Sequence, residues 1–498
     1  MPRQRLHDVL SGRRLTRLEY EHELPKLQDR LLDAQFDSRQ DPRRAVVMIV
    51  TGIPAAGRSE VVNELLGWLD PKFVTVYGFR GLNEVELQRP PLWRYWRIMP
   101  PRGRCVILHS GWYQEILQGP DGVRGSHASP AARKRAIERI RQLERMLVQD
   151  GVRLVKVHLH VAPETQQKRL DKLEADKTTR WRVSHEDRWM ARHYAQVEQA
   201  YEEILAATEQ GVAPWHLVDG TDAQHRALEV GRHLLDGLAE GAARSAARRG
   251  SARGGSTSAA GKVRLPTRPG SGSISDEEYD EQLERLQGRL ALLSRRKRFE
   301  RHAVVAAFEG MDAAGKGGAI RRITAALDAR QYRVVPISAP SPEELARPYL
   351  WRFWFHLPPR GNYTLFDRSW YGRVLVERVR GLAPPRDWQR AYDEINEFER
   401  QLAEHSIVVA KFWLSVSRKE QLERFGERDR NPLKRFKVDP EDWANRQRWN
   451  DYQLAAREMI ARTDTAHAPW TVIPADDKRH ARLTVLRALA DRIETALD

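Results

Sequence analysis

The sixteen residues AVVAAFEGMDAAGKGG (303–318) decide the fold of this chain. They begin with an unbroken apolar run, which is typical of a strand buried on both faces of a parallel sheet. The segment AIRRITAAL (319–327) follows and predicts a helix. Gly310, Gly315 and Lys316 then have the G-x-x-x-x-G-K spacing of a P-loop, or Walker A motif. The alternative is a glycine-rich turn that binds nothing, but the strand–loop–helix context favours the P-loop.

This loop has the chemistry of a phosphate site with one departure. Its backbone N–H groups and the helix N-terminus attract anions, and we expect Lys316 to contact the transferred phosphate. The Ser or Thr that ordinarily follows the lysine and binds Mg²⁺ is Gly317 here, so we expect Asp312 to supply the oxygen ligand instead. The other loop residues expected to bind phosphate are Gly310, Ala313, Ala314, Gly315, Gly317 and Gly318.

A second acid follows a later apolar run, in the sequence LFDRSWYGR (365–373). An acid at the end of a buried strand beside a P-loop is the Walker B arrangement, so Asp367 is predicted to be the second Mg²⁺ ligand. Arg368 and Arg373 are predicted to contact phosphate oxygens. The alternative is a solvated Asp–Arg pair on the surface.

A basic stretch, RFGERDRNPLKRFK (424–437), comes later in the chain. P-loop kinases often close a basic helical lid over the transferred phosphoryl group. Lys434 and Lys437 are therefore candidate phosphate-binding residues. A solvated helix face is the competing interpretation of the same run of charge.

The chain is also an internal repeat. AVVMIVTGIPAAGRSE (45–60) corresponds to the stretch at 303–318, and RPPLWRYWRIMPPRGR (89–104) corresponds to RPYLWRFWFHLPPRGN (347–362), both with an offset of 258 residues. Further along, the alignment pairs Trp189 with Trp443. Two copies of one domain explain this constant order.

The first copy lacks the residues that are predicted to bind Mg²⁺ and the transferred phosphate in the second copy. Asp312, Lys316 and Asp367 are replaced by Pro54, Arg58 and His109. Without the two carboxylates we expect no Mg²⁺-dependent transfer in the first copy.

Each copy is predicted to be a three-layer α/β domain, because apolar runs alternate with helical stretches. The strands expected in the second copy are Ala303–Phe308, Tyr363–Phe366, Ile407–Val416 and Thr471–Ile473. The predicted organisation is a first domain at 1–240, a flexible basic linker at 241–273 and a catalytic domain at 274–498.

The charge of the chain favours a polyanionic partner. Lys and Arg number 84 against 68 Asp and Glu, a net charge of +16, of which seven lie in the predicted linker. No apolar run approaches the length of a membrane helix, and the single cysteine, Cys105, excludes an internal disulfide. We therefore expect a cytoplasmic protein without a membrane partner.

With these motifs, the sequence resembles the polyphosphate kinase 2 family. The resemblance rests on G-x-D-x-x-G-K-G (310–317), DRSWY (367–371) and NPLK-x-F-K (431–437), and it spans the second copy in order, with a degraded version in the first. Phe436 stands where many members have Trp. The two-copy layout and Gly372 are similar to the fused class II members, which are polyphosphate:AMP phosphotransferases. The resemblance implies two tandem P-loop kinase domains of thymidylate-kinase type, Mg²⁺ and a helical lid.

The function expected from this resemblance is phosphoryl transfer from inorganic polyphosphate to AMP, giving ADP. Rival hypotheses are transfer to ADP or polyphosphate synthesis, an ATP-dependent nucleotide kinase, and a basic binding protein for nucleic acid or stored polyphosphate. The intact Asp312, Lys316 and Asp367 argue against a binding protein, so no nucleic-acid partner is expected. We expect the first copy to act as an internal partner domain, and the protein to be a homo-oligomer, a dimer.

Overall fold

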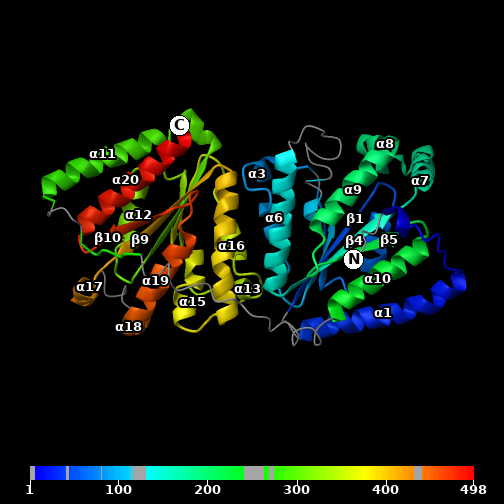
Figure 1. The fold of residues 1–498 in the computed structure, drawn as a ribbon, viewed down its shortest axis with the longest axis horizontal. Helices are drawn as coiled ribbons and strands as arrows, with labels where there is room; N and C mark the ends of the chain where they lie inside the picture. Colours follow the sequence, from blue (N-terminus) through cyan, green and yellow to red (C-terminus); the bar gives the residue numbers. More distant parts are fainter. Residues whose placement is uncertain are drawn as a thin grey trace. The chain divides into compact units, whose positions relative to one another are not determined.

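The computed structural model describes residues 6–40, 44–79, 81–113, 116, 130–239, 263–268, 274–430 and 440–498. The chain divides into two compact units, one formed mainly by residues 1–250 and the other mainly by residues 251–498. Each unit contains one five-stranded sheet covered by helices (Figure 1). No helix among the described residues is long and apolar enough to cross a membrane.

The second unit contains a parallel sheet with the strand order β10-β9-β6-β8-β7. Four of its strands match the expected ones. The fifth, β7, was not predicted, because it lies at the sheet edge and most of its side chains are at least partly exposed. The strands are β6 (Ala303–Gly310), β7 (Tyr332–Pro336), β8 (Tyr363–Asp367), β9 (Ile407–Ser415) and β10 (Trp470–Pro474).

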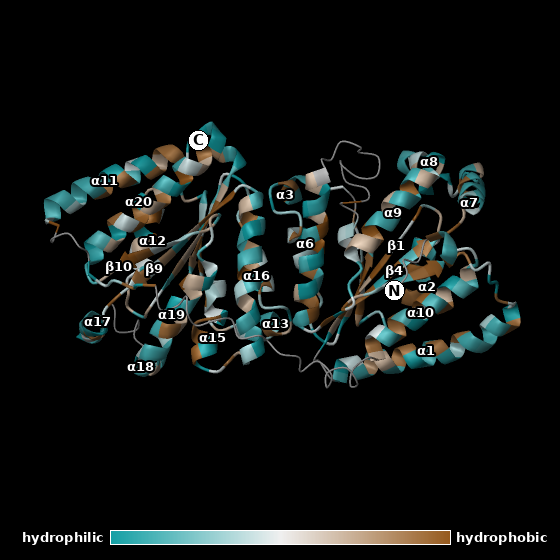
Figure 2. Cartoon of the chain, in the orientation of Figure 1, coloured by the Kyte–Doolittle hydropathy of each residue, from teal (hydrophilic) through white to brown (hydrophobic). Residues whose placement is uncertain are grey.

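Helices cover both faces of this sheet, as the predicted three-layer fold requires. One layer holds α11 (Asp276–Leu293), α12 (Lys316–Thr324) and α20 (Lys478–Leu497), which contact one another. The other holds α15 (Val376–Val379), α16 (Pro385–Glu404) and α19 (Trp449–Thr463). The apolar strands lie between helices that turn their polar faces outward (Figure 2). Between β9 and α19 the chain forms α17 (Arg418–Arg430) and α18 (Pro440–Gln447).

The first unit has the same topology, with the strand order β2-β3-β1-β4-β5. The repeat seen in the sequence is therefore a repeat of the fold. Its strands are β1 (Ala45–Gly52), β2 (Val74–Gly78), β3 (Cys105–His109), β4 (Val152–His160) and β5 (Trp215–Asp219). Its long helices are α1 (Arg17–Gln40), α2 (Arg58–Trp68), α6 (Pro130–Gln149), α7 (Pro163–Ala175), α8 (His185–Arg192), α9 (Tyr194–Thr208) and α10 (Ala223–Ala239). One-turn helices elsewhere in the chain are α3 (Glu84–Leu87), α4 (Trp93–Trp96), α13 (Pro342–Leu345) and α14 (Trp351–Trp354).

The helix bounds correct one pairing of the sequence alignment. Helices α8 and α18 have the same length and are offset by 255 residues, as are α9 and α19. Trp189 therefore corresponds to Ala444 and not to Trp443, and Met190 corresponds to Asn445. A one-residue error arises easily here because a tryptophan lies near the same place in both helices.

Part of the predicted linker lies against the second unit. The Ser415 hydroxyl donates to the Leu265 carbonyl at 3.1 Å, and the Asp476 amide donates to the Thr267 carbonyl at 3.0 Å. Residues 263–268 are therefore attached to the carboxyl edge of this sheet. The rest of the predicted linker, up to residue 273, lies outside the described residues.

Candidate functional site

The loop after β6 has the backbone shape of a phosphate cradle. Gly310 ends the strand at φ 146°, and a Cβ atom there would lie 2.5 Å from the Leu414 carbonyl oxygen. Ala313 and Gly315 then adopt left-handed conformations at φ 60° and 109°, and Gly315 caps α12. Alternation of right- and left-handed residues directs successive N–H groups toward one point, where an anion binds.

Two side chains of α17 hold the carbonyl groups of this loop. Gln421 donates to the Asp312 carbonyl at 3.0 Å, and Arg424 donates to the Ala313 carbonyl at 2.9 Å and to the Ala475 carbonyl at 2.6 Å. Arg424 is only 3% exposed. The sequence interpretation placed Arg424 at the start of a lid, but the structure makes it a brace of the P-loop.

The two charged residues of the loop already have partners. Lys316 donates to the carbonyls of Gly310 (2.8 Å) and Met311 (3.3 Å), so its ammonium group lies against the loop. Asp312 forms an ion pair with Arg368 at 2.7 Å and accepts a second hydrogen bond from Asn445 at 3.0 Å. The structure thus brings Asp312 and Arg368 together, as phosphate chemistry at one site requires.

Asp367 lies at the carboxyl end of β8, beside the first turn of α12. Its Oδ2 atom is 3.9 Å from the point where a Cβ atom of Gly317 would lie. The described residues contain no cluster of three or more acidic, His or Cys side chains that could hold a metal by itself. Asp312 and Asp367 nevertheless suit Mg²⁺, which takes one or two carboxylates and completes its shell with phosphate oxygens and water. Each oxygen of Asp312 has at least one further lone pair with which it could bind the metal ion.

The remaining predicted site residues differ in their surroundings. Arg373 forms an ion pair with Glu377 at 2.8 Å. Gly318 lies near Arg482, whose guanidinium nitrogens are 3.6 Å from the Cβ position of the glycine. Lys434 and Lys437 lie outside the described residues.

Sequence reasoning missed Glu309, which precedes the first glycine of the loop. It is 4% exposed and accepts a hydrogen bond from the Ser369 hydroxyl at 2.8 Å. Burial raises the pKa of Glu309, and Ser369, Lys316 and Arg368 oppose the rise. Burial alone would lower the pKa of Arg368. The negative charges of Asp312, Glu309 and Asp367 outweigh this effect, so the pKa is raised. An acid inside an apolar strand was the available signal for Glu309, whereas no motif pointed to Arg482.

Comparison with known proteins assigns the family of this fold and site. The family model of polyphosphate kinase 2 matches residues 14–246 and 273–498. The chain belongs to the polyphosphate kinase 2 family. A polyphosphate:AMP phosphotransferase of Pseudomonas aeruginosa is 45% identical over 97% of this chain and 98% of its own length. One from Acinetobacter johnsonii is 35% identical over 94% and 96%. A crystal structure described as a polyphosphate kinase 2 from Pseudomonas aeruginosa PA01 has a TM-score of 0.85, with 42% identity and 99% of each chain covered.

The first polyphosphate kinase 2 unit keeps the shape of the loop but not its carboxylate or its lysine. Ala55 and Gly57 repeat the left-handed conformations at φ 59° and 98°, and Arg169 repeats the brace by donating to the Ala55 carbonyl at 2.8 Å. Arg58, in the place of Lys316, instead donates to Ser110 at 3.0 Å. Burial, with a smaller contribution from Arg58, lowers the pKa of His109 to about 4, so a neutral imidazole replaces the Asp367 carboxylate.

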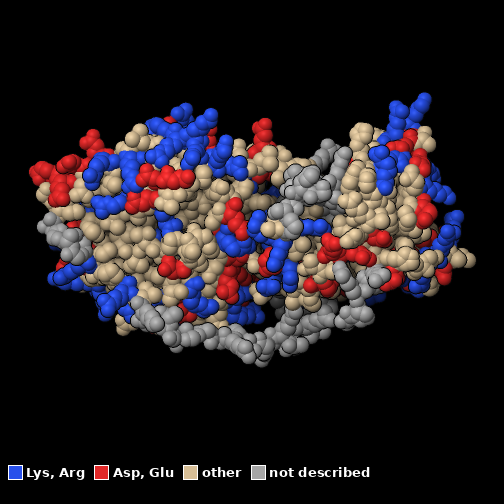
Figure 3. Space-filling view, turned by 45° about the horizontal axis from the view of Figure 1, so that its top comes forward, with Lys and Arg blue, Asp and Glu red and all other residues tan. Residues whose placement is uncertain are grey.

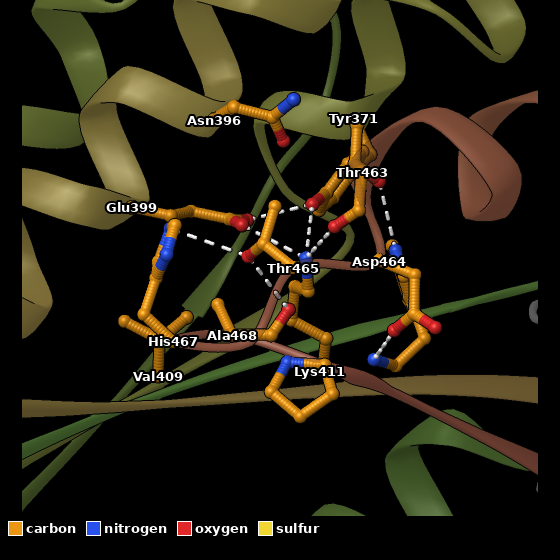
Figure 4. Close-up of polar contacts among 12 residues, drawn as sticks. Tyr371, Asn396, Glu399, Val409, Lys411, Thr463, Asp464, Thr465, His467 and Ala468 are labelled. Atoms are coloured by element: carbon orange, nitrogen blue, oxygen red, sulfur yellow. Dashed lines mark hydrogen bonds and ion pairs between the residues drawn. The ribbon is translucent and has the colours of Figure 1, made fainter.

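Both units retain one buried polar network away from the loop, and Figure 4 shows this network in the second unit. Lys411 of β9 donates to Glu399 at 2.8 Å, to the Tyr371 hydroxyl at 2.9 Å and to the Thr463 carbonyl at 2.6 Å. The first unit repeats these contacts with Lys156, Glu144, Tyr113 and Thr208. Because the network is also present in the unit that lacks Asp312, Lys316 and Asp367, it belongs to the fold shared by the two polyphosphate kinase 2 units.

Proposed function

We propose that this protein transfers the terminal phosphoryl group of inorganic polyphosphate to AMP, giving ADP. One observation carries the proposal: Asp312, Lys316, Asp367 and Arg368 lie together at the carboxyl edge of the second sheet, around a P-loop. The relatives named polyphosphate:AMP phosphotransferase support AMP as the acceptor, because they match nearly the whole two-unit chain. Relatives named for ADP or GDP match 43–48% of it.

The chemistry of this transfer needs neutralisation and positioning more than a base. The AMP phosphate has a second pKa of about 6, so it is already largely dianionic at pH 7. The loop N–H groups, Lys316 and Arg368 would hold the two anionic reactants together and stabilise the charge of the transferred group. Mg²⁺ held by Asp312 and Asp367 would neutralise phosphate oxygens further. Arg373 and the lid residues Lys434 and Lys437 are proposed as additional phosphate contacts.

On the face shown in Figure 3, the Lys and Arg side chains do not form one continuous surface. On the face shown in Figure 3, Asp and Glu side chains are interspersed with Lys and Arg over the unit that contains α11 and α20. The net charge of +16 therefore favours a polyanion only in a general way. We assign the selectivity for polyphosphate to the P-loop and to the positively charged side chains around it.

The test is a transfer assay with Mg²⁺, polyphosphate and either AMP or ADP. We expect ADP to form from AMP, and D312N and K316A each to lower the rate by about 100-fold or more, the usual cost of losing one preorganised electrostatic group. The matched control is R58A in the first unit, which should leave the rate unchanged. ATP formed from ADP with no ADP formed from AMP would exclude AMP as the acceptor. Unchanged turnover in D312N and K316A would exclude the proposed site.

A further inference from the structure

Three side chains, joined by hydrogen bonds, connect the P-loop to helices α18 and α19. Asn445 of α18 donates its Nδ2 hydrogen to Asp312 Oδ2 at 3.0 Å. The Tyr452 hydroxyl of α19 donates to Asn445 Oδ1, also at 3.0 Å. Asn445 is 6% exposed and Tyr452 is 7% exposed. These two residues are 133 and 140 positions from Asp312, so no local motif predicts the contact.

The direction of these hydrogen bonds is fixed by chemistry. An ionised carboxylate only accepts hydrogen bonds, so the amide group must turn its NH₂ toward Asp312. The amide oxygen then faces Tyr452, which can donate only while it keeps its proton. Burial, reinforced by the charge of Asp312, raises the pKa of Tyr452 to about 12, so the hydroxyl stays protonated. Tyr452 therefore holds Asn445 in the single orientation that serves Asp312.

The first unit shows what these positions contain when the chemistry is absent. Pro54 corresponds to Asp312, Met190 to Asn445 and Val197 to Tyr452. Met190 and Val197 are each 1% exposed, so the positions stay buried while their polarity is lost. The Lys411 network and the Arg424 brace are present in both units, whereas this chain of polar residues is present only in the second. Apolar residues can therefore fill these positions, so the fold does not require the hydrogen-bonded residues Asp312, Asn445 and Tyr452.

We propose that Asn445 is a positioning residue that holds the Asp312 carboxylate in its working orientation, and that Tyr452 acts through Asn445. Arg368 holds one oxygen of Asp312 and Asn445 holds the other. Removal of the second contact frees the carboxylate to rotate about its side-chain bonds. The role concerns the proposed transfer reaction and so rests on the proposed function.

The experiment compares N445M, Y452F and the double variant with wild type, using the full chain. Groups that orient a metal-binding carboxylate typically contribute 10- to 100-fold to metal affinity or activity. We expect N445M to raise the half-saturating Mg²⁺ concentration or lower kcat by about 10-fold, with KM for polyphosphate changed less than about 2-fold. Y452F should show a smaller effect in the same direction. Its effect should disappear in the N445M background, because Tyr452 then has no amide to orient. N445S serves as a second variant if N445M does not fold.

A second readout is taken in EDTA, without substrate or metal. The shifts in thermal midpoint caused by N445M and D312A should not add in the double variant, because each substitution removes the hydrogen bond between Asn445 and Asp312. The matched control M190N should leave the rate and its Mg²⁺ dependence unchanged. A wild-type Mg²⁺ dependence and kcat in N445M would overturn the proposal, as would an undiminished Y452F effect in the N445M background. An inactive wild type would count against the proposed function alone, since the EDTA measurement still tests the contact.

Discussion

The buried lysine of the shared network provides the sharpest test of how each unit is stabilised. In K411M the methionine fills much of the lysine volume but donates nothing. Among the described residues, Glu399 then keeps Trp370 (3.0 Å) and Tyr371 (2.6 Å) as donors, and the Thr463 carbonyl loses its 2.6 Å hydrogen bond. Both members of the ion pair are fully buried. Removal of one partner of a buried pair costs about 3–5 kcal/mol, because the other charge stays uncompensated.

This cost is large compared with the stability of a domain, which is about 5–15 kcal/mol. For a urea dependence of about 3 kcal/mol per molar, this cost corresponds to a shift of the unfolding midpoint of about 1–1.7 M. Urea unfolding gives the shift, and hydrogen exchange read by mass spectrometry locates it. Exchange should rise in β9 and α19 for K411M, and in β4 and α9 for the matched variant K156M. Because E399Q/K411M removes both charges, it should recover part of the loss. A cost below about 1 kcal/mol, or a double variant less stable than K411M, would refute this reasoning.

Three further predictions concern pH, the loop and salt. Burial raises the pKa of Glu394 to about 7 despite the nearby Arg390 and Arg373, so the free energy of unfolding should fall as the pH rises from 4.5 through 7. The variant E394Q should remove up to about 3 kcal/mol of this loss, which urea unfolding at pH 5 and pH 8 measures. A difference in stability between E394Q and wild type that does not change with pH would contradict the raised pKa. G310A should abolish phosphoryl transfer, because the new Cβ would lie 2.5 Å from the Leu414 carbonyl oxygen. G52A makes the same close contact in the first unit, with the Leu159 carbonyl oxygen, and should lower stability but leave transfer in place. Equal losses of activity in the two variants would contradict a single working site. KM for polyphosphate should rise with KCl more steeply than KM for AMP, because a longer polyanion releases more counterions, and parallel slopes would contradict this.

The sequence was sufficient for the parts of the fold that depend on local pattern. The apolar run, the two glycines and the following segment correctly predicted β6, the loop and the existence of α12, although α12 spans Lys316–Thr324 and the helix was expected at 319–327. Strand β7 was missed because an edge strand with exposed side chains lacks the continuous apolar run of a buried strand.

The site was predictable only as far as its motifs extend. Asp312 and Arg368 were both proposed, and the structure places them 2.7 Å apart. Asn445 and Arg424 act on the loop from more than 100 residues away, and nothing in their local sequence distinguishes them from surface residues. Arg424 in particular belongs to a run of charge whose burial only the packing of α17 reveals.

The two loops also have a consequence for the energetics of binding. Ala55 and Ala313 have nearly the same left-handed backbone, although the loop of the first unit lacks both the lysine and the carboxylate of the second. Such a conformation costs an alanine on the order of 1 kcal/mol or more, and the packing around it imposes that cost when the unit folds. A phosphate that binds as proposed would meet a loop that is already in its binding shape. Little conformational entropy is lost on binding, and more of the contact energy is expressed as affinity.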